Sequence, residues 1–297
     1  MFKNIRIPAS FSLIEKGKVS LLLKEEYKNL LLAQGIDDFR TFLRKTSHAA
    51  RYLKGRTPHP SIPFDGEKRM VLRQYSHGGL LRAITRNLYL FDARSFRELA
   101  LTEEIRSSGV PTITSIGAVH YSVFFPFYQA YFLSVEIPRA LDLIQYFSEV
   151  GTHPSPEGIS SKRKTIRSIG LLIRQFHQAG FFHGDLQLKN ILVTENLPLL
   201  IDFDHSYRKS PLSVKARMRN LLRLNRSVEK WKRRGLPVTR TDRWRFFLAY
   251  AGDNETIRER MEKTLRTFSL RSLFYRFAWA IEKIAGRLDS GVRGNQV

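Results

Sequence analysis

The sequence predicts an α+β fold with two lobes, a small lobe built on an antiparallel sheet and a larger, mainly helical lobe. Alternation of apolar and polar residues, typical of strands, is concentrated between residues 51 and 137, whereas helical periodicity dominates over 138–297. A length of 297 residues allows one two-lobed domain or two small ones, and an apolar share of 42% suits a protein with a core. We therefore expect a lead-in with one helix over 1–50, the small lobe over 51–137 and the helical lobe over 138–297.

The lead-in is expected to be irregular chain with a single amphipathic helix. Gly35 offers a stop for that helix, because glycine commonly ends helices. The apolar residues of the expected helix are Leu21, Leu22, Leu23, Leu30, Leu31 and Leu32.

The small lobe begins with a stretch punctuated by Gly and Pro, 54–64, which predicts a loop flanked by extended chain. The dipeptide Asp65-Gly66 is a hairpin signal. The regular elements expected after it are a strand over Met70–Tyr75, a helix over Arg94–Ser107, and two strands of one sheet over Thr112–His120 and Val123–Val135.

The larger lobe contains the clearest helix of the chain. The stretch 148–161 is rich in Gly, Pro and Ser and predicts a loop, after which one apolar face recurs at helical spacing until Gly180 ends the helix. That face consists of Ile166, Ile169, Ile173 and Phe176. Two short strands, Ile191–Val193 and Leu199–Ile201, a basic helical segment over 207–245 and further helices over 255–287 complete the expected order.

The charge of the chain constrains its partners. A net charge of +23 favours anionic partners, which are nucleic acid, an anionic membrane surface, or a substrate that carries phosphate or carboxylate groups. The chain has no cysteine, which excludes disulfides, zinc–thiolate sites and cysteine nucleophiles. It also shows no signal peptide and no apolar run of the roughly 18 residues that a membrane span needs. We expect a cytoplasmic protein that can rest on a membrane surface.

One constellation carries the chemistry. His183-Gly184-Asp185 is followed by Asn190, and twelve residues later by Asp202-Phe203-Asp204. Phosphoryl transfer needs a carboxylate that orients the attacking hydroxyl and accepts its proton, together with oxygen ligands for Mg²⁺. Asp185 fits the first role, and Asn190 and Asp202 fit the second. His183 and His177 are expected to be structural residues that support the loop rather than bases.

This constellation resembles the catalytic loop and metal-binding motif of the protein-kinase-like superfamily. The resemblance implies that Arg73 stands in the place of the ATP-binding lysine, with Glu98 as its partner; a solvated helix residue is the alternative for Glu98. Glu136 stands where a hinge would present backbone groups to adenine. Gly55 and Arg56 stand where a phosphate-covering loop would be, although a plain surface turn explains them equally well.

Two departures from protein kinases are informative. Gly184 stands where protein kinases have an arginine that responds to the phosphorylated activation loop. Asp204 replaces the glycine of the usual Asp-Phe-Gly triplet. Both indicate a kinase of small molecules rather than of proteins.

Further motifs narrow the resemblance to the bacterial lipopolysaccharide kinase family. They are 70–80 (MVLRQYSHGGL), 94–98 (RSFRE), 109–111 (GVP), the loop 183–190, 201–204 (IDFD) and 220–227 (NLLRLNRS), within a similarity that runs from about Gly55 to Lys230. The first and last of these are most similar to the branch that phosphorylates Kdo (3-deoxy-D-manno-octulosonic acid); heptose is the second possibility. The resemblance implies ATP and Mg²⁺ as cofactors, a lipopolysaccharide core or lipid A precursor as acceptor, and a peripheral position on the cytoplasmic face of the inner membrane.

The basic segment 207–245 leaves alternatives open. It holds fourteen Lys or Arg and two acidic residues, with apolar residues between them. Such a segment can lie on an anionic membrane, hold an anionic substrate, or pack on the helical lobe with a solvated basic face. We favour these over nucleic acid. Two competing functions remain, a kinase of another acceptor such as an aminoglycoside, choline or a protein, and a catalytically silent kinase-like protein that binds membrane or nucleic acid.

Overall fold

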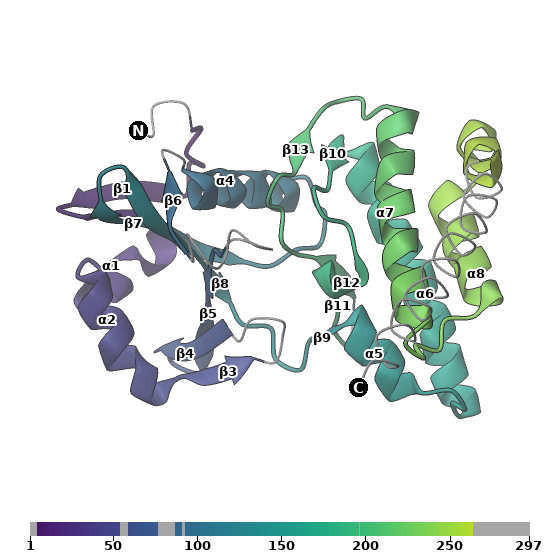
Figure 1. Ribbon diagram of the computed structural model, residues 1–297, viewed down its shortest axis with the longest axis horizontal. Helices are drawn as coiled ribbons and strands as arrows, with labels where there is room; N and C mark the ends of the chain where they lie inside the picture. Colours follow the sequence, from purple (N-terminus) through teal and green to yellow (C-terminus); the bar gives the residue numbers. More distant parts are fainter. Residues whose placement is uncertain (1–4, 54–58, 77–86, 91–92, 196, 264–297) are drawn as a thin grey trace, which may run out of the picture.

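The computed structural model describes residues 5–53, 59–76, 87–90, 93–195 and 197–263, and it has the expected α+β architecture. Figure 1 shows two lobes beside each other, the sheet with helices α1, α2 and α4 in one and helices α5–α8 in the other. The main sheet is antiparallel, with strand order β1-β2-β7-β8-β5-β4-β3 and the short strand β6 paired with β8. Its strands are β1 (Phe11–Lys16), β2 (Val19–Lys24), β3 (Arg51–Leu53), β4 (His59–Asp65), β5 (Lys68–Gln74), β6 (Tyr89–Leu90), β7 (Ser115–Phe124) and β8 (Phe127–Val135).

The sheet is covered on both faces. Within β2, Leu21 and Leu23 join the cluster under α1 (Glu25–Ala33) and α2 (Phe39–Thr46), while Leu22 points to the opposite face. There it packs with Phe96 of α4 (Arg94–Ser107). This alternation follows from the two-residue period of a strand, and it fixes α4 against the sheet (Figure 1).

The expected irregular lead-in with a single helix is wrong, because the segment contains a strand hairpin and two α-helices, α1 and α2. Residues 11–24 form the hairpin β1–β2, and β2 pairs with β7, so this segment extends the sheet of the small lobe. Leu21–Leu23 belong to the strand, and only Leu30–Leu32 lie in a helix, α1. The three consecutive leucines suited a helix face and a strand buried on both faces equally well, and pairing with β7 decided between them. The domain boundary at residue 50 stays a prediction.

Most elements of the small lobe match the expected ones, but the loop expected over 54–64 does not, because its described part lies in strand β4. The Asp65-Gly66 turn joins β4 to β5, with Gly66 at a φ of 55°, and α4 covers Arg94–Ser107 as expected. The two strands expected after it pair as β7 and β8.

The larger lobe is built around α6 (Pro156–Gln178). Its predicted face, Ile166, Ile169, Ile173 and Phe176, is buried, and the chain turns at Gly180, whose φ is 89°. The expected loop over 148–161 is too long, because α5 ends at Val150 and Ser155 already caps α6, with Pro156 at its start. The other elements are β9 (Leu141–Asp142), α5 (Leu143–Val150), β10 (Phe181–Phe182), η2 (Leu188–Asn190), β11 (Ile191–Val193), β12 (Pro198–Leu200), β13 (Tyr207–Arg208), α7 (Val214–Lys232) and α8 (Arg240–Ala251).

An apolar cavity of about 120 Å³ lies among α5, α6, α7 and α8. Phe147, Ile169, Leu221 and Phe247 are among its lining residues, whereas Asp185, Asn190 and Asp202 are not. The cavity therefore lies behind the predicted catalytic loop, whose Leu188 lines it, and none of the three predicted catalytic and metal-binding residues does. Among the described residues, no helix is long and apolar enough to cross a membrane.

Candidate active site

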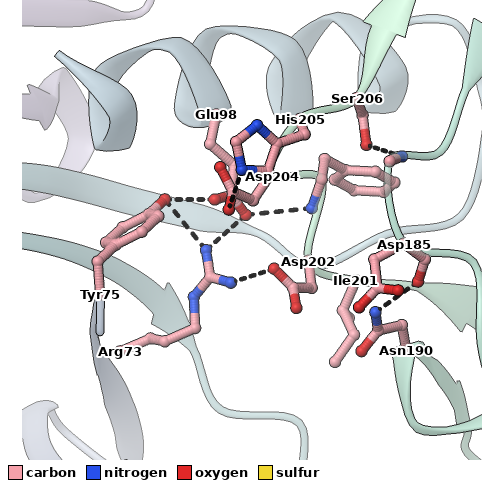
Figure 2. Close-up of polar contacts among 12 residues, drawn as sticks. Arg73, Tyr75, Glu98, Asp185, Asn190, Ile201, Asp202, Asp204, His205 and Ser206 are labelled. Atoms are coloured by element: carbon pink, nitrogen blue, oxygen red, sulfur yellow. Dashed lines mark hydrogen bonds and ion pairs between the residues drawn. The ribbon is translucent and has the colours of Figure 1, made fainter. Parts of the chain in front are cut away.

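The predicted catalytic loop, residues 183–190, follows β10, contains η2 and ends where β11 begins, in the larger lobe. Asn190 is buried, and its side-chain amide donates a 2.8 Å hydrogen bond from Nδ2 to the backbone carbonyl of Asp185 (Figure 2). The loop thus folds back on itself and brings Asn190 next to Asp185, as the spacing predicted. The bond uses Nδ2, so it leaves Oδ1 of the amide available for another contact.

His183 is the internal support of this loop. Its ring is fully buried, Nδ1 accepts the backbone N–H of Asp185 at 3.0 Å, and Nε2 donates to the carbonyl of Ile201 at 3.1 Å. Burial lowers the pKa of His183 to about 4, so the ring is neutral near pH 7. The prediction that His183 is structural is confirmed by these contacts.

His177 is also structural. It is fully buried on α6, where Nδ1 lies 2.7 Å from the hydroxyl of Tyr250 and Nε2 lies 3.1 Å from Oδ1 of Asn220. Burial lowers the pKa of His177 to about 3. Its partners therefore face a neutral ring.

The segment that carries Asp202 is tied to both ends of the catalytic loop. The backbone N–H of Ile201 donates to the carbonyl of Asn190 at 3.1 Å, while the carbonyl of Ile201 accepts from His183. Asp202 itself has a φ of 65°, a left-handed conformation that is uncommon for a residue other than glycine. The turn this produces comes directly after β12, at the position where sequence reasoning expected the metal carboxylate.

Arg73 of β5 joins the two lobes at this point. Nη1 donates to Oδ1 of Asp202 at 2.5 Å, and Nη2 donates to Oε1 of Glu98 at 2.5 Å and to the hydroxyl of Tyr75 at 3.1 Å (Figure 2). The predicted pairing of Arg73 with Glu98 is therefore present. Glu98 also accepts from the hydroxyl of Tyr75 and, at 3.1 Å, from the backbone N–H of Phe203.

The charges in this cluster support one another. Burial opposes the charge on Arg73, but Glu98 and Asp202 outweigh it and hold the pKa of the guanidinium above its usual value. Burial likewise acts to raise the pKa of Asp202, but Arg73 overcomes it, so the pKa of this carboxyl is lowered. For Glu98, burial dominates and raises the pKa. Asp202 is thus kept ionised, which is the state a metal ligand needs.

Asp204, the residue that replaces the usual glycine, holds α4 in place. Oδ1 of Asp204 accepts from Nε of Arg94 at 2.7 Å, and Nη2 of Arg94 bonds the second oxygen. A bidentate arginine–carboxylate pair has a defined geometry, so it fixes the first turn of α4, and with it Glu98, relative to the segment of Asp202.

Three residues contact Asp185 or its loop and were not predicted from the sequence as site residues. Nε and Nη2 of Arg223 lie 2.8 Å and 2.6 Å from Oδ1 of Asp185, and Gln187 donates to the other carboxylate oxygen. Asn220, one turn earlier on α7, bonds both the backbone N–H and the carbonyl of His183. The motif 220–227 had marked this helix as significant, but a helical pattern does not reveal which loop its face meets.

One other predicted position, Glu136, is not part of this cluster. Gly55 and Arg56 lie outside the described residues. The carboxylate of Glu136 bonds Arg51 and Ser61, and its backbone N–H donates to the carbonyl of Arg69 at 2.8 Å. Glu136 directly follows β8, in the segment that leads to the larger lobe. Its contact with adenine stays a prediction.

The residues present fit a magnesium ion. Mg²⁺ usually keeps several waters and takes one or two protein oxygens together with substrate phosphates. Asp202 keeps a free carboxylate oxygen beside the one that Arg73 holds, and the amide of Asn190 is oriented by Asp185. Within the described ranges, no three His, Asp or Glu side chains cluster to form a metal cage of their own. Asp202 and Asn190 would therefore hold the ion together with nucleotide phosphates.

Comparison with known proteins identifies the family. The model of the lipopolysaccharide kinase (Kdo/WaaP) family matches residues 41–250. The chain belongs to this family. The match includes β5, α4, the catalytic loop and α7, so every element of the cluster described above lies within the family's shared region.

Curated relatives in the lipopolysaccharide kinase family carry the name 3-deoxy-D-manno-octulosonic acid kinase. The chain is similar to that of Pasteurella multocida, with 32% identity over 54% of this chain and 65% of the relative. It is similar to that of Xylella fastidiosa strain 9a5c, with 34% identity over 54% of this chain and 61% of the relative. The chain thus spans less than two thirds of the length of these relatives.

A solved structure, WaaP in complex with acyl carrier protein, shares the fold. The likeness covers 83% of this chain and 98% of that chain, with a TM-score of 0.52 and 17% sequence identity. At this identity the likeness concerns the fold alone. It agrees with the two-lobed, protein-kinase-like architecture.

Proposed function

We propose that this protein is an ATP-dependent kinase that phosphorylates a hydroxyl of Kdo in a Kdo–lipid A acceptor. Membership of the lipopolysaccharide kinase family supports a phosphotransferase, and the names of the curated relatives favour Kdo over heptose. The observation that carries the proposal is the junction of the catalytic loop with the segment of Asp202, which brings Asp185, Asn190 and Asp202 to one place.

Asp185 is the catalytic base in this proposal. Its carboxylate is partly exposed, with 32% of the side chain accessible, so a hydroxyl of the acceptor can reach it. There it orients the hydroxyl toward the γ-phosphate and accepts its proton as transfer proceeds. The backbone N–H bonded to His183 and the carbonyl bonded to Asn190 keep Asp185 in position.

Asn190 and Asp202 hold the magnesium ion of MgATP, and Arg73 contacts the phosphates. Bound Mg²⁺ neutralises phosphate charge during transfer. Arg73 is held from two sides by Glu98 and Asp202, which orients its guanidinium before the nucleotide arrives. Gly55, Arg56 and Glu136 are the further nucleotide contacts that we propose, over the phosphates and at adenine respectively.

The acceptor and the charge of the protein suit a position at the cytoplasmic face of the inner membrane. Kdo carries a carboxylate, lipid A carries phosphates, and the leaflet around them is anionic, so a chain of net charge +23 is attracted to all three. Peripheral binding through basic side chains follows from this proposal.

The test is transfer of labelled phosphate from Mg[γ-³²P]ATP to a panel of acceptors. We expect wild-type protein to label Kdo–lipid A in preference to a heptose-containing core, an aminoglycoside or choline. Asp185→Asn should lower kcat by about 10³-fold or more, because it removes the base while keeping the shape of the side chain. Asp142→Asn, a carboxylate that only caps α5, is the matched control.

Two results would contradict the proposal. One is full transfer by Asp185→Asn, which would rule out Asp185 as the base. The other is wild-type labelling of another acceptor class with none of Kdo–lipid A. Absence of any MgATP binding by wild type would instead favour a silent kinase-like protein.

A further inference from the structure

The structure places a cation directly on the catalytic carboxylate. Arg223 of α7 bonds Asp185, although the reaction proposed above gives it no role. We propose that Arg223 binds an anionic group of the acceptor, a carboxylate or a phosphate, beside the hydroxyl that Asp185 receives. This inference rests on the proposed function and deepens it, because it names the charge that the site requires of its acceptor.

The ion pair is open to solvent and therefore exchangeable. The side chain of Arg223 is 46% exposed and that of Asp185 is 32% exposed. Such a pair contributes little net stability, because water screens it, so an incoming anion can share or replace the carboxylate at small cost. Arg223 uses Nε and Nη2 on one oxygen of Asp185 and has no other hydrogen bond within the described part of the chain. Its remaining N–H groups are free to form the forked contact that guanidinium makes with carboxylate or phosphate.

The helix presents Arg223 at a fixed position. Asn220, which is fully buried, bonds the backbone of His183 at 2.9 Å and 2.8 Å, and the hydroxyl of Ser227 accepts the backbone N–H of Leu188 at 3.3 Å. These contacts lie one turn before and one turn after Arg223, at both ends of the catalytic loop. The backbone at Arg223 is thus held, and its guanidinium is already paired with Asp185, so binding an anion orders less of this arginine than of an unpaired one on flexible chain.

The surroundings of Arg223 attract anions. Four exposed Lys and Arg side chains share its face of α7 at intervals of three or four residues. They are Lys215, Arg219, Arg226 and Lys230. The one acidic residue of α7, Glu229, is paired with Arg243 of α8. Within the described part of the chain, this face of α7 therefore carries positive charge next to Asp185 that no acidic residue of α7 offsets.

The position of Arg223 favours the acceptor over the nucleotide. The nucleotide side of the site is set by Arg73 of the small lobe, which bonds Asp202 and Glu98. Arg223 comes from the larger lobe and bonds Asp185, where the attacking hydroxyl must lie. A sugar that carries its anionic group next to the reacting hydroxyl would bridge Arg223 and Asp185.

The test combines Arg223→Gln with changes in the acceptor. Three acceptors are compared by steady-state kinetics: Kdo–lipid A, its carboxylate methyl ester, and its dephosphorylated form. Arg223→Gln should raise KM for Kdo–lipid A by about 10- to 100-fold, the effect of losing a charge-assisted contact, and leave KM for ATP unchanged. The KM of Arg223→Lys for Kdo–lipid A should lie between those of wild type and Arg223→Gln, because lysine keeps the positive charge but lacks the two parallel N–H donors of a guanidinium. Arg163→Gln, which removes an exposed arginine of α6, is the control for net charge.

The acceptor that loses its sensitivity to Arg223→Gln identifies the anion. If the effect on KM vanishes with the ester, Arg223 binds the carboxylate; if it vanishes with the dephosphorylated form, Arg223 binds a phosphate. Equal effects on all three acceptors, an unchanged KM for Kdo–lipid A, or a rise in KM for ATP instead would overturn the inference. A thermal melt of each variant separates these results from misfolding, and Arg223→Lys supplies the answer should Arg223→Gln not fold.

Binding separates failure of this inference from failure of the proposed function. Calorimetric titration of Kdo–lipid A into protein with a non-hydrolysable ATP analogue needs no turnover. Wild type that neither binds nor phosphorylates any of the three acceptors would overturn the proposed function and this inference with it. If wild type and Arg223→Gln bind the acceptor with equal affinity, the inference is overturned and the proposed function is not.

Discussion

At position 184 a glycine is required by space. A Cβ at Gly184 would lie 2.4 Å from the backbone oxygen of Asp204 and 2.7 Å from the backbone carbon of His205. These neighbours are backbone atoms, which cannot rotate away. The sequence suggested that the missing arginine reflects a kinase of small molecules; the structure adds that no side chain at all fits here, because Asp204 and the catalytic loop are in contact.

Gly184→Ala should therefore disturb both stability and catalysis. Overpacking of this kind costs about 1–3 kcal/mol of unfolding free energy, and relief of the clash would move the segment that carries Asp202 and Asp204. We expect a lower melting temperature and a fall in kcat of at least about ten-fold, measured by thermal unfolding and phosphate transfer. Gly158→Ala on α6, where a Cβ meets nothing nearer than 3.3 Å, should leave kcat unchanged. Equal kcat in both variants would refute the spatial argument.

Arg73 and Glu98 form a buried pair whose two members depend on each other. Arg73→Met leaves the carboxylate of Glu98, 3% exposed, without its cation, and we expect a loss of about 3–5 kcal/mol in urea unfolding. Adding Glu98→Gln should recover part of that loss, because the uncompensated charge is then gone. A double variant less stable than Arg73→Met would contradict this coupling.

At the scale of elements, α7 could be predicted as a helix, but its packing partners could not. Its helical character and basic composition were predicted, and its caps, Ser213 before Val214 and the chain turn after Lys232, follow common helix rules. Its contacts with the catalytic loop could not be predicted, since they depend on packing between residues 37 positions apart. The hairpin β1–β2 was missed for a related reason, because its pairing with β7 is also distant in sequence.

Asn220→Ala tests the connection between α7 and the loop. Asn220 bonds both backbone groups of His183 and lies within reach of His177, all buried, so its loss leaves several polar groups unsatisfied. We expect a loss of at least about 2 kcal/mol in unfolding free energy, together with reduced kcat. Asn225→Ala on the same helix should cost clearly less. If the two substitutions cost the same, Asn220 is not the anchor.

At the scale of the whole molecule, the buried histidines predict how stability changes with pH. The pKa values of His177 and His183, about 3 and about 4, lie below the usual 6.5. Below pH 6.5, both rings therefore bind a proton in the unfolded chain while they stay neutral in the folded one. Stability is therefore complete above about pH 6.5 and falls as the pH drops toward 4, by about 1.4 kcal/mol per pH unit for each ring. Urea unfolding at pH 7.5, 6 and 5 measures this slope.

His177→Gln isolates one ring in this experiment. Burial raises the pKa of Glu98, which acts with the opposite sign, but Glu98 is present in both proteins and cancels in the comparison. We expect the variant to be less stable at pH 7.5, yet to lose less stability between pH 6.5 and 5 than wild type. An identical slope would show that His177 is not buried in its neutral form.

The two-lobed architecture could be expected because strand patterns precede helical patterns along the chain. The proximity of Asp185, Asn190 and Asp202 could be expected because a short spacing between motif residues limits how far apart they can lie. The pairing of Arg73 with Glu98 followed from the same motif pattern and is present. What could not be expected are contacts made by opposed surfaces, such as Arg94 with Asp204 and Arg223 with Asp185. These depend on how helices dock, and no periodicity along the chain encodes the docking partner.

The most direct test of the central claim is tandem mass spectrometry of lipopolysaccharide core from cells that carry the active gene or its Asp185→Asn allele. We predict a phosphate on Kdo in the first strain and an unphosphorylated Kdo in the second, with the variant protein present at equal level. A phosphate on Kdo in both strains, or on heptose in the first alone, would contradict the assignment of this protein as a Kdo kinase with Asp185 as its base.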